Sequence, residues 1–424
     1  MITLKDRFGN KIDGSVGYAR GRILSDPTDE SRRYSHGLRL IQERASLYGL
    51  ESIAVFTGNL RSLPIRGEDI ELAEEWIGSA IFHPQLIVCA REHLSANSDD
   101  GVAVFNRTSA GIIATILALC SSGVPIISVV PRGSSHASIR RGALLAQCPL
   151  VEINSEEQLE LALDQFAGSP VFITGVTSEL DVMSATMFAN CIELAHQEKR
   201  LVFVDDAYGA RVRTIIFNQL PARKLGADIV ITNNDKAGLN GPRAGILVGE
   251  KDLIQSIIAK GMELGMEARA PIALGVLRSL QSFSPENLLQ EVGLGRELYR
   301  GLAERIGNKY VAQATIGPII REDDILAVAL KRAGTADHPL IVPAEAAAAF
   351  GMLLLKNHGI LTVNVSGMPG ARVSIRLKPT PEQIEKVGGI PAVIEAVDDT
   401  INELAKIINK PGTIRGLITG NESF

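Results

Sequence analysis

Short apolar runs alternate with amphipathic stretches from about residue 100 onward, and this alternation constrains the fold of the 424-residue chain more than any other feature. The apolar runs predict buried strands, and the stretches at 138–147, 155–166 and 184–197 have the spacing of helices. Strands alternating with helices favour a mostly parallel sheet with helices on both faces. The predicted strands are Val102–Phe105, Pro125–Val130, Pro149–Ile153, Pro170–Thr174, Leu201–Val204 and Asp228–Thr232.

One further apolar run, Gly245–Gly249, follows the last of these strands after only 12 residues rich in Asn and Gly. Because that connection leaves little room for a crossover helix, this strand is predicted to lie antiparallel in the sheet. The uncharged stretch 108–130 is long enough to span a bilayer, but Ser-Ser-Gly-Val-Pro at 121–125 divides it into a helix and a strand. We therefore expect no membrane segment.

The chain ends predict a second, smaller domain. Helical spacing occurs at 36–48 and 69–79 and, after residue 284, at 284–306, 343–356 and 389–410, with apolar strands near 359–365 and 371–377. Segment 310–340 has no clear pattern and is interpreted as an irregular insertion or subdomain. The predicted organisation is an N-terminal helical segment (1–60) that joins the small domain, a large α/β domain (61–285) and a C-terminal small α+β domain (286–424).

Composition narrows the possible functions. Lys and Arg total 43 against 48 Asp and Glu, so the formal charge of −5 gives no broad positive surface for a nucleic acid. The four cysteines form no CxxC or Cys/His cluster, which indicates neither a zinc site nor a disulfide framework. The N-terminus lacks the apolar core of a signal peptide. A cytoplasmic protein is expected.

Residues that follow the predicted strands are the candidates for a site, because ligands of open parallel sheets bind at the carboxyl ends of the strands. After Val102–Phe105, Thr108 and Ser109 open an apolar helix whose free backbone N–H groups can hold an anion. The same pair is also an ordinary helix cap. After Pro125–Val130 comes His136, which can cover a flat ligand, move a proton or serve only the structure.

A carboxylate and an amine follow two further strands. Asp205 comes directly after Leu201–Val204, where a carboxylate is costly unless it meets a cation or a metal. Nothing nearby has metal-ligand spacing, so no metal is expected. Lys236 follows Asp228–Thr232 and precedes a Gly-rich loop, where a desolvated amine can form Schiff bases with carbonyls. A solvated surface lysine is the alternative interpretation.

Taken in chain order, the helix start, the histidine, the aspartate and the lysine resemble the site of fold-type-I enzymes that depend on pyridoxal 5′-phosphate (PLP). Segment 227–254 (ADIVITNNDKAGLNGPRAGILVGEKDLI) resembles the lysine loop of bacterial selenocysteine synthase in its Asp-Lys, Gly-Pro and Ala-Gly-Ile pattern. Segment 201–211 (LVFVDDAYGAR) is similar to the Asp-bearing strand of that superfamily, and 106–111 to its phosphate loop. The chain is similar above all to an archaeal selenocysteine synthase-like branch of unassigned activity.

The resemblance implies an aspartate aminotransferase-like fold: a three-layer αβα large domain with a mostly parallel sheet, and a smaller α+β domain made from the chain ends. It also implies PLP as the cofactor. Sites of this fold type are normally completed across a dimer interface, so a homodimer or a larger symmetric homo-oligomer is expected.

The resemblance also implies a role for each candidate residue. Lys236 would form the Schiff base (aldimine) with PLP, Asp205 would bond the pyridine nitrogen, and His136 would stack on the ring and take part in proton transfer. The groups that would hold the phosphate are those of Thr108, Ser109, Ala110 and Arg243. In segment 370–376, the substrate carboxylate would be held by Arg372 or Arg376.

The reaction implied is that of a PLP-dependent transferase or lyase acting on a small amino acid, by elimination, β-replacement or transamination. L-seryl-tRNA(Sec) selenium transfer is an alternative, but only about 100 residues precede the phosphate loop and the chain is acidic. A PLP-binding protein without turnover is a second alternative. A nucleotide- or sugar-phosphate-binding α/β protein without PLP is a third.

Overall fold

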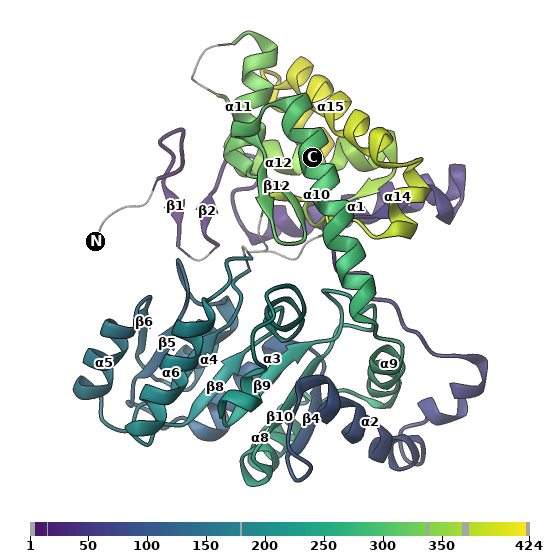
Figure 1. Ribbon diagram of the computed structural model, residues 1–424. Coiled ribbons are helices and arrows are strands. Elements are labelled where there is room, and N and C mark those ends of the chain that lie inside the picture. The colour runs from purple at the N-terminus through teal and green to yellow at the C-terminus, as the bar shows by residue number, and fades with distance from the viewer. Residues whose placement is uncertain (1–4, 15, 179, 336–338, 367–372, 421–424) are drawn as a thin grey trace. The chain divides into compact units, whose positions relative to one another are not determined.

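The computed structural model describes residues 5–14, 16–178, 180–335, 339–366 and 373–420. The chain divides into two compact units, one formed by Asn59–Leu289 and the other by Met1–Gly58 together with Gln290–Phe424. The first is called the sheet unit, and the second, which joins both chain ends, is called the terminal unit. Figure 1 shows their helices and strands coloured along the chain.

Among the described residues, a seven-stranded sheet forms the centre of the sheet unit, in the order β4-β10-β9-β8-β7-β5-β6. The pairs from β9 through β8, β7 and β5 to β6 are parallel, whereas β10 is antiparallel to both of its neighbours. The mostly parallel sheet and the antiparallel last strand are both confirmed. The strands are β4 (Gly101–Phe105), β5 (Ile126–Val129), β6 (Leu150–Ile153), β7 (Val171–Thr174), β8 (Val202–Asp205), β9 (Ile229–Asn233) and β10 (Gly245–Gly249).

Helices cover both faces of this sheet because its strands alternate apolar side chains between the faces. Phe203 of β8 packs in the cluster that holds α3, α4 and α8, whereas Val202 and Val204 pack in the cluster that holds α2, α5, α6 and α9. These helices are α2 (Gly78–Leu94), α3 (Thr108–Leu119), α4 (Ala137–Leu145), α5 (Glu156–Gln165), α6 (Ala185–Gln197), α8 (Lys251–Glu263) and α9 (Ala270–Gln281).

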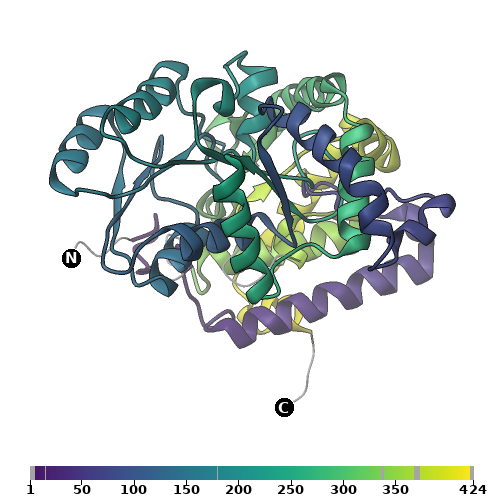
Figure 2. The same cartoon turned by 90° about the horizontal axis from the view of Figure 1, so that it is seen from below.

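The terminal unit is α+β. Its strands are β1 (Ile12–Asp13), β2 (Tyr18–Ala19), β3 (Ala54–Val55), β11 (Ala312–Ala314), β12 (Gly317–Ile320), β13 (Ile360–Leu361) and β14 (Ile375–Arg376). Its helices are α1 (Pro27–Tyr48), most of α10 (Pro285–Ile306), α11 (Glu322–Ala333), α12 (Pro343–His358), α13 (Val363–Ser366), α14 (Pro381–Val387), α15 (Ile390–Ile407) and α16 (Pro411–Thr419). Figure 2 shows the purple α1 along its full length.

The helix predicted at 69–79 is wrong. Two short 3₁₀ turns, Gly67–Asp69 and Glu71–Ala73, occupy the first part of this segment, and α2 begins only at Gly78. The cause is local competition for backbone N–H groups. The Asp69 carboxylate accepts a hydrogen bond from Arg66 N at 2.9 Å, and the Glu74 carboxylate accepts hydrogen bonds from the backbone N–H groups that follow it. These bonds interrupt the helical pattern, so the segment does not continue as one helix.

Two C-terminal expectations are also corrected. Segment 310–340 is not irregular over its described residues 310–335, because these form the β11–β12 hairpin and then α11, whose first turn is acidic and last turn basic, as the helix dipole favours. In 359–365 the strand is limited to Ile360–Leu361 and a short helix follows. In 371–377 only Ile375–Arg376 is a strand, and part of that range lies outside the described residues.

Across the described ranges, none of the helices combines the length and the apolar character that a membrane span requires. The uncharged stretch 108–130 is instead α3 followed by β5, as its internal Pro and Gly predict.

Candidate functional site

A cavity of about 140 Å³ lies in the sheet unit at the carboxyl ends of its parallel strands. The loops after β4, β5, β7, β8 and β9 all contribute to it, as expected for an open α/β sheet. The residues that line it are Arg61, Arg107, Thr108, Ser109, Ile112, Ser134, His136, Thr174, Val176, Thr177, Ser178, Asp205, Ala207, Tyr208, Asp235, Lys236 and Arg243.

The N-terminus of α3 forms one end of the cavity. The carbonyl of Arg107 accepts from the N–H groups of Ala110 and Gly111, whereas those of Thr108 and Ser109 precede the first helical hydrogen bonds. Ser109 Oγ is fixed by a 2.7 Å bond from Ser138 Oγ. Donors at the positive end of a 12-residue helix make this end suited to an anion.

Gly245 on β10 allows α3 to begin this close to the sheet. A Cβ at Gly245 would lie 2.7 Å from Thr108 Cα and 2.8 Å from Thr108 N, which are backbone atoms that cannot rotate away. Gly245→Ala should therefore displace the helix start and lower the free energy of unfolding by about 1–3 kcal/mol, measured by urea denaturation. Gly293→Ala is the control, because that exposed position in α10 has nothing within 4 Å and should be unchanged or slightly more stable. Equal losses in the two variants would contradict the close-approach argument.

Three guanidinium groups surround the same end of the cavity. Burial, together with the nearby charges of Arg61 and Arg107, lowers the pKa of Arg243 to about 10. Arg61 Nε lies 3.0 Å from Asp235 Oδ2, so one carboxylate partly offsets the cluster. Cations that repel one another beside a helix N-terminus would be stabilised by a bound anion.

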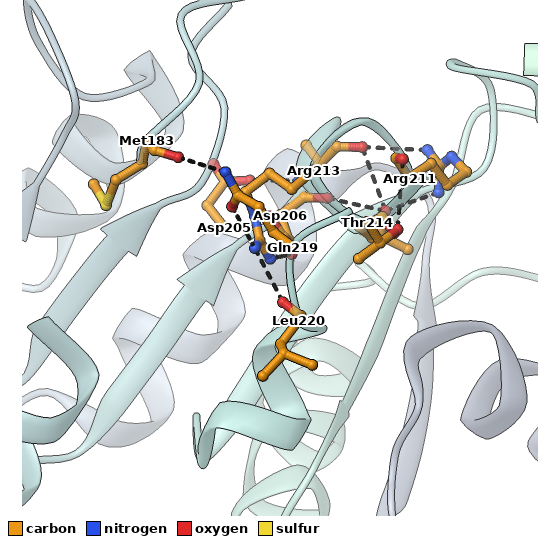
Figure 3. A network of polar contacts seen from close by, with 11 residues as sticks. Met183, Asp205, Asp206, Arg211, Arg213, Thr214, Gln219 and Leu220 are labelled. Atoms are coloured by element: carbon orange, nitrogen blue, oxygen red, sulfur yellow. Dashed lines mark hydrogen bonds and ion pairs between the residues drawn. The ribbon is translucent and has the colours of Figure 1, made fainter. Parts of the chain in front are cut away.

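Asp205 and Asp206 are adjacent in sequence but have different surroundings (Figure 3). Asp206 forms a buried ion pair with Arg213, whose Nε lies 3.0 Å from Asp206 Oδ1. Asp205 lines the cavity and accepts one hydrogen bond, from Ala207 N at 3.2 Å. Burial raises the pKa of Asp205 to about 6, although the Ala207 N–H and the Lys236 charge oppose that rise. The Asp205 carboxylate is thus placed to receive a cationic partner in the cavity.

Lys236 lies in the loop between β9 and β10 and is half-buried. Its Nζ lies 5.0 Å from the centre of the Tyr208 ring, and within the described residues no hydrogen bond or ion pair engages that amine. Ala237, the next residue, has a φ of 51°, a left-handed conformation that side chains other than Gly rarely adopt. This strained turn and the buried Asp205 occur together at the cavity, and such combinations cluster at functional sites.

His136 caps α4 and lines the cavity from the loop after β5. Its Nδ1 accepts from Ser138 N at 3.2 Å, and Ser138 Oγ continues the chain of contacts to Ser109. The imidazole is exposed, so the capping bond holds the ring at the cavity while leaving its surface open to a ligand.

The structure brings most of the sequence-predicted site residues together. Those that line the one cavity are Thr108, Ser109, His136, Asp205, Lys236 and Arg243. Ala110 is in the first turn of α3 but is not among the lining residues. Arg376 belongs to the terminal unit, where its Nε donates to Ser374 Oγ at 3.1 Å, and Arg372 lies outside the described residues.

Several lining residues were not predicted. Thr174 ends β7, and its buried hydroxyl has no hydrogen-bond partner among the described residues. The position of Thr174 at the end of a predicted strand could have identified it as a site residue. Tyr208 could have been identified in the same way, because it lies three residues after Asp205. Arg107 follows the predicted strand Val102–Phe105 within segment 106–111, so its position was a signal of the same kind, whereas nothing local distinguishes Arg61 from the chain's other arginines.

Comparison with known sequences shows one family. A family model described as the UPF0425 C-terminal domain matches residues 317–388. A UPF0425 pyridoxal phosphate-dependent protein of Methanothermobacter thermautotrophicus is 32% identical over 398 residues, which cover 94% of this chain and 100% of that protein. A protein of the same description from Methanosphaera stadtmanae is 31% identical over 384 residues, covering 91% and 97%.

Comparison with solved structures shows the fold. The chain superposes with a TM-score of 0.57 on SepCysS in its complex with the SepCysE N-terminal domain, at 13% identity, covering 83% of this chain and 95% of that one. Serine palmitoyltransferase of Sphingomonas wittichii also gives 0.57, at 14% identity and coverage of 84% and 88%. Ureidoglycine-glyoxylate aminotransferase of Bacillus subtilis gives 0.57 at 10% identity, with coverage of 87% and 98%. The architecture is that of fold-type-I PLP enzymes, as expected.

Proposed function

This chain is a member of the UPF0425 family of pyridoxal phosphate-dependent proteins, and from that premise we propose that it is a PLP enzyme acting on a small amino acid. The cofactor would lie in the cavity of the sheet unit and be attached to Lys236. The reaction class is elimination, β-replacement or transamination. The selenocysteine synthase-like pattern of the loop 227–254 supports this choice of reactions.

The observation that carries the proposal is the buried carboxylate of Asp205 beside the amine of Lys236 in one cavity. A carboxylate in this position costs free energy unless a cation meets it, and the protonated ring nitrogen of PLP is such a cation. The Thr174 hydroxyl in the same cavity, which has no partner within the described ranges, is a second polar group that a ligand would satisfy.

The other end of the cavity, at the N-terminus of α3, has groups suited to bind the negatively charged phosphate of PLP. The N–H groups of Thr108 and Ser109, with the guanidinium of Arg243, would hold the phosphate. A phosphate dianion there would stabilise the charged form of Arg243, whose pKa is lowered by burial and then by repulsion from Arg61 and Arg107. The residues of the cavity therefore fit PLP in both charge and chemistry.

Bound PLP withdraws electrons from the α-carbon of an amine and so weakens the bonds at that carbon. This chain's residues supply the rest. The Asp205 carboxylate keeps the ring nitrogen protonated, Lys236 Nζ takes or returns the proton at the substrate Cα, and His136 covers the open side of the site. Arg372 or Arg376 would hold the substrate carboxylate.

A free amino acid is proposed rather than a charged tRNA because the net charge of −5 opposes polyanion binding. A cytoplasmic location agrees with the four cysteines, all of which are free. A homodimer or a larger symmetric assembly is proposed on the likeness to fold-type-I enzymes.

The attachment of PLP is tested by reducing the purified protein with borohydride and mapping the modified peptide by mass spectrometry. The expected adduct is on Lys236, and Lys236→Ala should abolish it together with the visible absorption of the bound cofactor. Lys224→Ala, which removes an exposed lysine of the same unit, is the control and should change neither. An adduct on a different lysine, or none, would overturn the assignment.

Turnover is tested separately with a panel of amino acids in D₂O. Every reaction class proposed starts at the substrate Cα–H bond, so at least one amino acid should gain deuterium at Cα with the wild-type protein and none with Lys236→Ala. If PLP is bound to Lys236 but no amino acid exchanges, the protein binds PLP without turnover and the enzymatic part of the proposal fails.

A further inference from the structure

Arg211 is a fully buried arginine beside the site that the proposed function does not use. It ends the short helix α7 (Gly209–Arg211), which follows β8, and only 1% of its surface is exposed. A guanidinium has five N–H donors, and five hydrogen bonds of Arg211 are present. They run from Nε to Ala237 O (3.0 Å), from Nη1 to Thr232 Oγ1 (3.0 Å) and His93 Nε2 (3.2 Å), and from Nη2 to Asn233 Oδ1 (2.7 Å) and Ala207 O (3.3 Å).

These bonds connect the two loops that carry Asp205 and Lys236. The bond to Ala237 O holds the residue directly after Lys236, which is the one in the left-handed conformation. The bond to Ala207 O holds the peptide chain whose Ala207 N–H donates to Asp205. Asn233 Nδ2 also donates to Ala207 O, so the end of β9 and the loop after β8 are linked by the same network.

We propose that Arg211 is a positioning residue that fixes the Lys236 amine relative to the Asp205 carboxylate, through its simultaneous bonds to Ala237 O and Ala207 O. The inference rests on the proposed function, since it assigns to Arg211 the geometry that PLP attachment requires. A misplacement of about 1 Å of a reacting group can reduce turnover by about 100-fold, so a brace at this point has a large effect.

Arg211 is unsuited to bind substrate itself. Its five donors are already directed at protein acceptors, so an incoming anion would have to displace one of them. Burial and the Arg211 charge lower the pKa of His93 to about 3, so the imidazole is neutral at working pH and its Nε2 accepts from Nη1. A partner that stays neutral keeps this bond over the whole range in which the enzyme would operate.

Arg213 provides a matched control two residues away. It is equally buried, at 0% exposure, and its bonds go to Asp206, Gln219 and Leu220. None of these acceptors belongs to the Lys236 loop. Arg211→Lys and Arg213→Lys each keep a buried charge and remove a guanidinium fork, so they disturb the fold in comparable ways while only the first removes contacts to that loop.

The experiment measures the dissociation constant of PLP for each variant, with thermal unfolding as a check on the fold. Arg211→Lys should weaken PLP binding by about 10- to 100-fold, the size of effect seen for residues that orient metal ligands in other proteins. Arg213→Lys should lower the unfolding temperature and leave PLP binding within about twofold of wild type. In Arg211→Ala, millimolar guanidinium, far below denaturing concentrations, should restore part of the lost PLP affinity, whereas ammonium should not.

The outcomes separate the inference from the function on which it rests. If wild-type protein carries no PLP on Lys236, the proposed function fails. If wild type binds PLP and Arg211→Lys and Arg213→Lys weaken binding equally, Arg211 only stabilises the fold and the positioning role is overturned. The same conclusion follows if guanidinium does not restore PLP affinity to Arg211→Ala. Loss of PLP affinity in Arg211→Lys but not in Arg213→Lys, with the unfolding temperature lowered to a similar extent in both, supports the role.

Discussion

Asp206→Asn should lower the free energy of unfolding of this protein by about 3–5 kcal/mol, the usual effect of removing one partner of a buried ion pair. Arg213 is fully buried, and its guanidinium lies 3.8 Å from the centre of the Phe188 ring, so no water can replace the lost carboxylate. Gly175 and Gly209 leave space for the pair, since a Cβ at either would meet Asp206 Oδ1. The amide of Asn can accept one bond from Arg213 but carries no charge to balance it.

Chemical denaturation at neutral pH, with the slope of the transition checked for two-state behaviour, measures this loss. The double variant Asp206→Asn with Arg213→Met is the control. Removing both charges should recover part of the stability, because an uncompensated buried charge is the main cost. If the double variant is less stable than Asp206→Asn by a further 3 kcal/mol or so, the two residues contribute independently and the ion-pair explanation fails.

Asp205→Asn should raise the free energy of unfolding of the PLP-free protein, whereas Asp206→Asn should lower it. A rise in the pKa of Asp205 from 3.8 to about 6 means that ionising this group costs about 3 kcal/mol more in the folded protein than in the unfolded chain. Between these pH values the folded state binds more protons than the unfolded state, so stability falls as the pH rises from about 4 to 6. The asparagine variant does not ionise there, and it should be more stable than wild type by up to about 3 kcal/mol near pH 8.

The measurement is the difference in unfolding free energy between wild type and Asp205→Asn, taken from about pH 4 to about pH 8 after removal of PLP. The difference should be near zero at the acid end and grow through pH 6. With PLP bound the order should reverse, because the variant loses the carboxylate that faces the ring nitrogen. A difference independent of pH would show that Asp205 is not the group that titrates.

Strands β7, β8 and β9 were predictable because they are buried along their full length, so each is mainly an apolar run in the sequence. The antiparallel β10 followed from connection length alone. The helical spacing at 36–48 falls within α1, but segment 69–79 was not predictable in the same way. Its apolar spacing is helical, but the carboxylates of Asp69 and Glu74 bind nearby backbone N–H groups, an effect that hydrophobic periodicity does not record.

For the site, chain order at the strand ends was sufficient to place His136, Asp205 and Lys236 at one cavity. Their catalytic roles stay predictions. Asp205 was chosen because it directly follows a predicted strand, and its role was implied by resemblance. The structure adds a physical distinction from its neighbour, since Asp206 has the buried Arg213 as its partner. Arg211 was invisible in the sequence because its function depends on acceptors 21 to 26 residues later and on His93, 118 residues earlier.

The antiparallel course of β10 links the positions of two cavity residues, Lys236 and Arg243. Because β9 and β10 are neighbours in opposite directions, with Asn233 paired to Gly245, the loop between them leaves and returns at the same edge of the sheet. Asn234 N donates to Ala244 O at 3.2 Å and so closes this loop at its base. Lys236 and Arg243, which both line the cavity, therefore belong to one small closed loop. A substitution that breaks the pairing of β9 with β10 should therefore displace the Lys236 amine and the Arg243 guanidinium together.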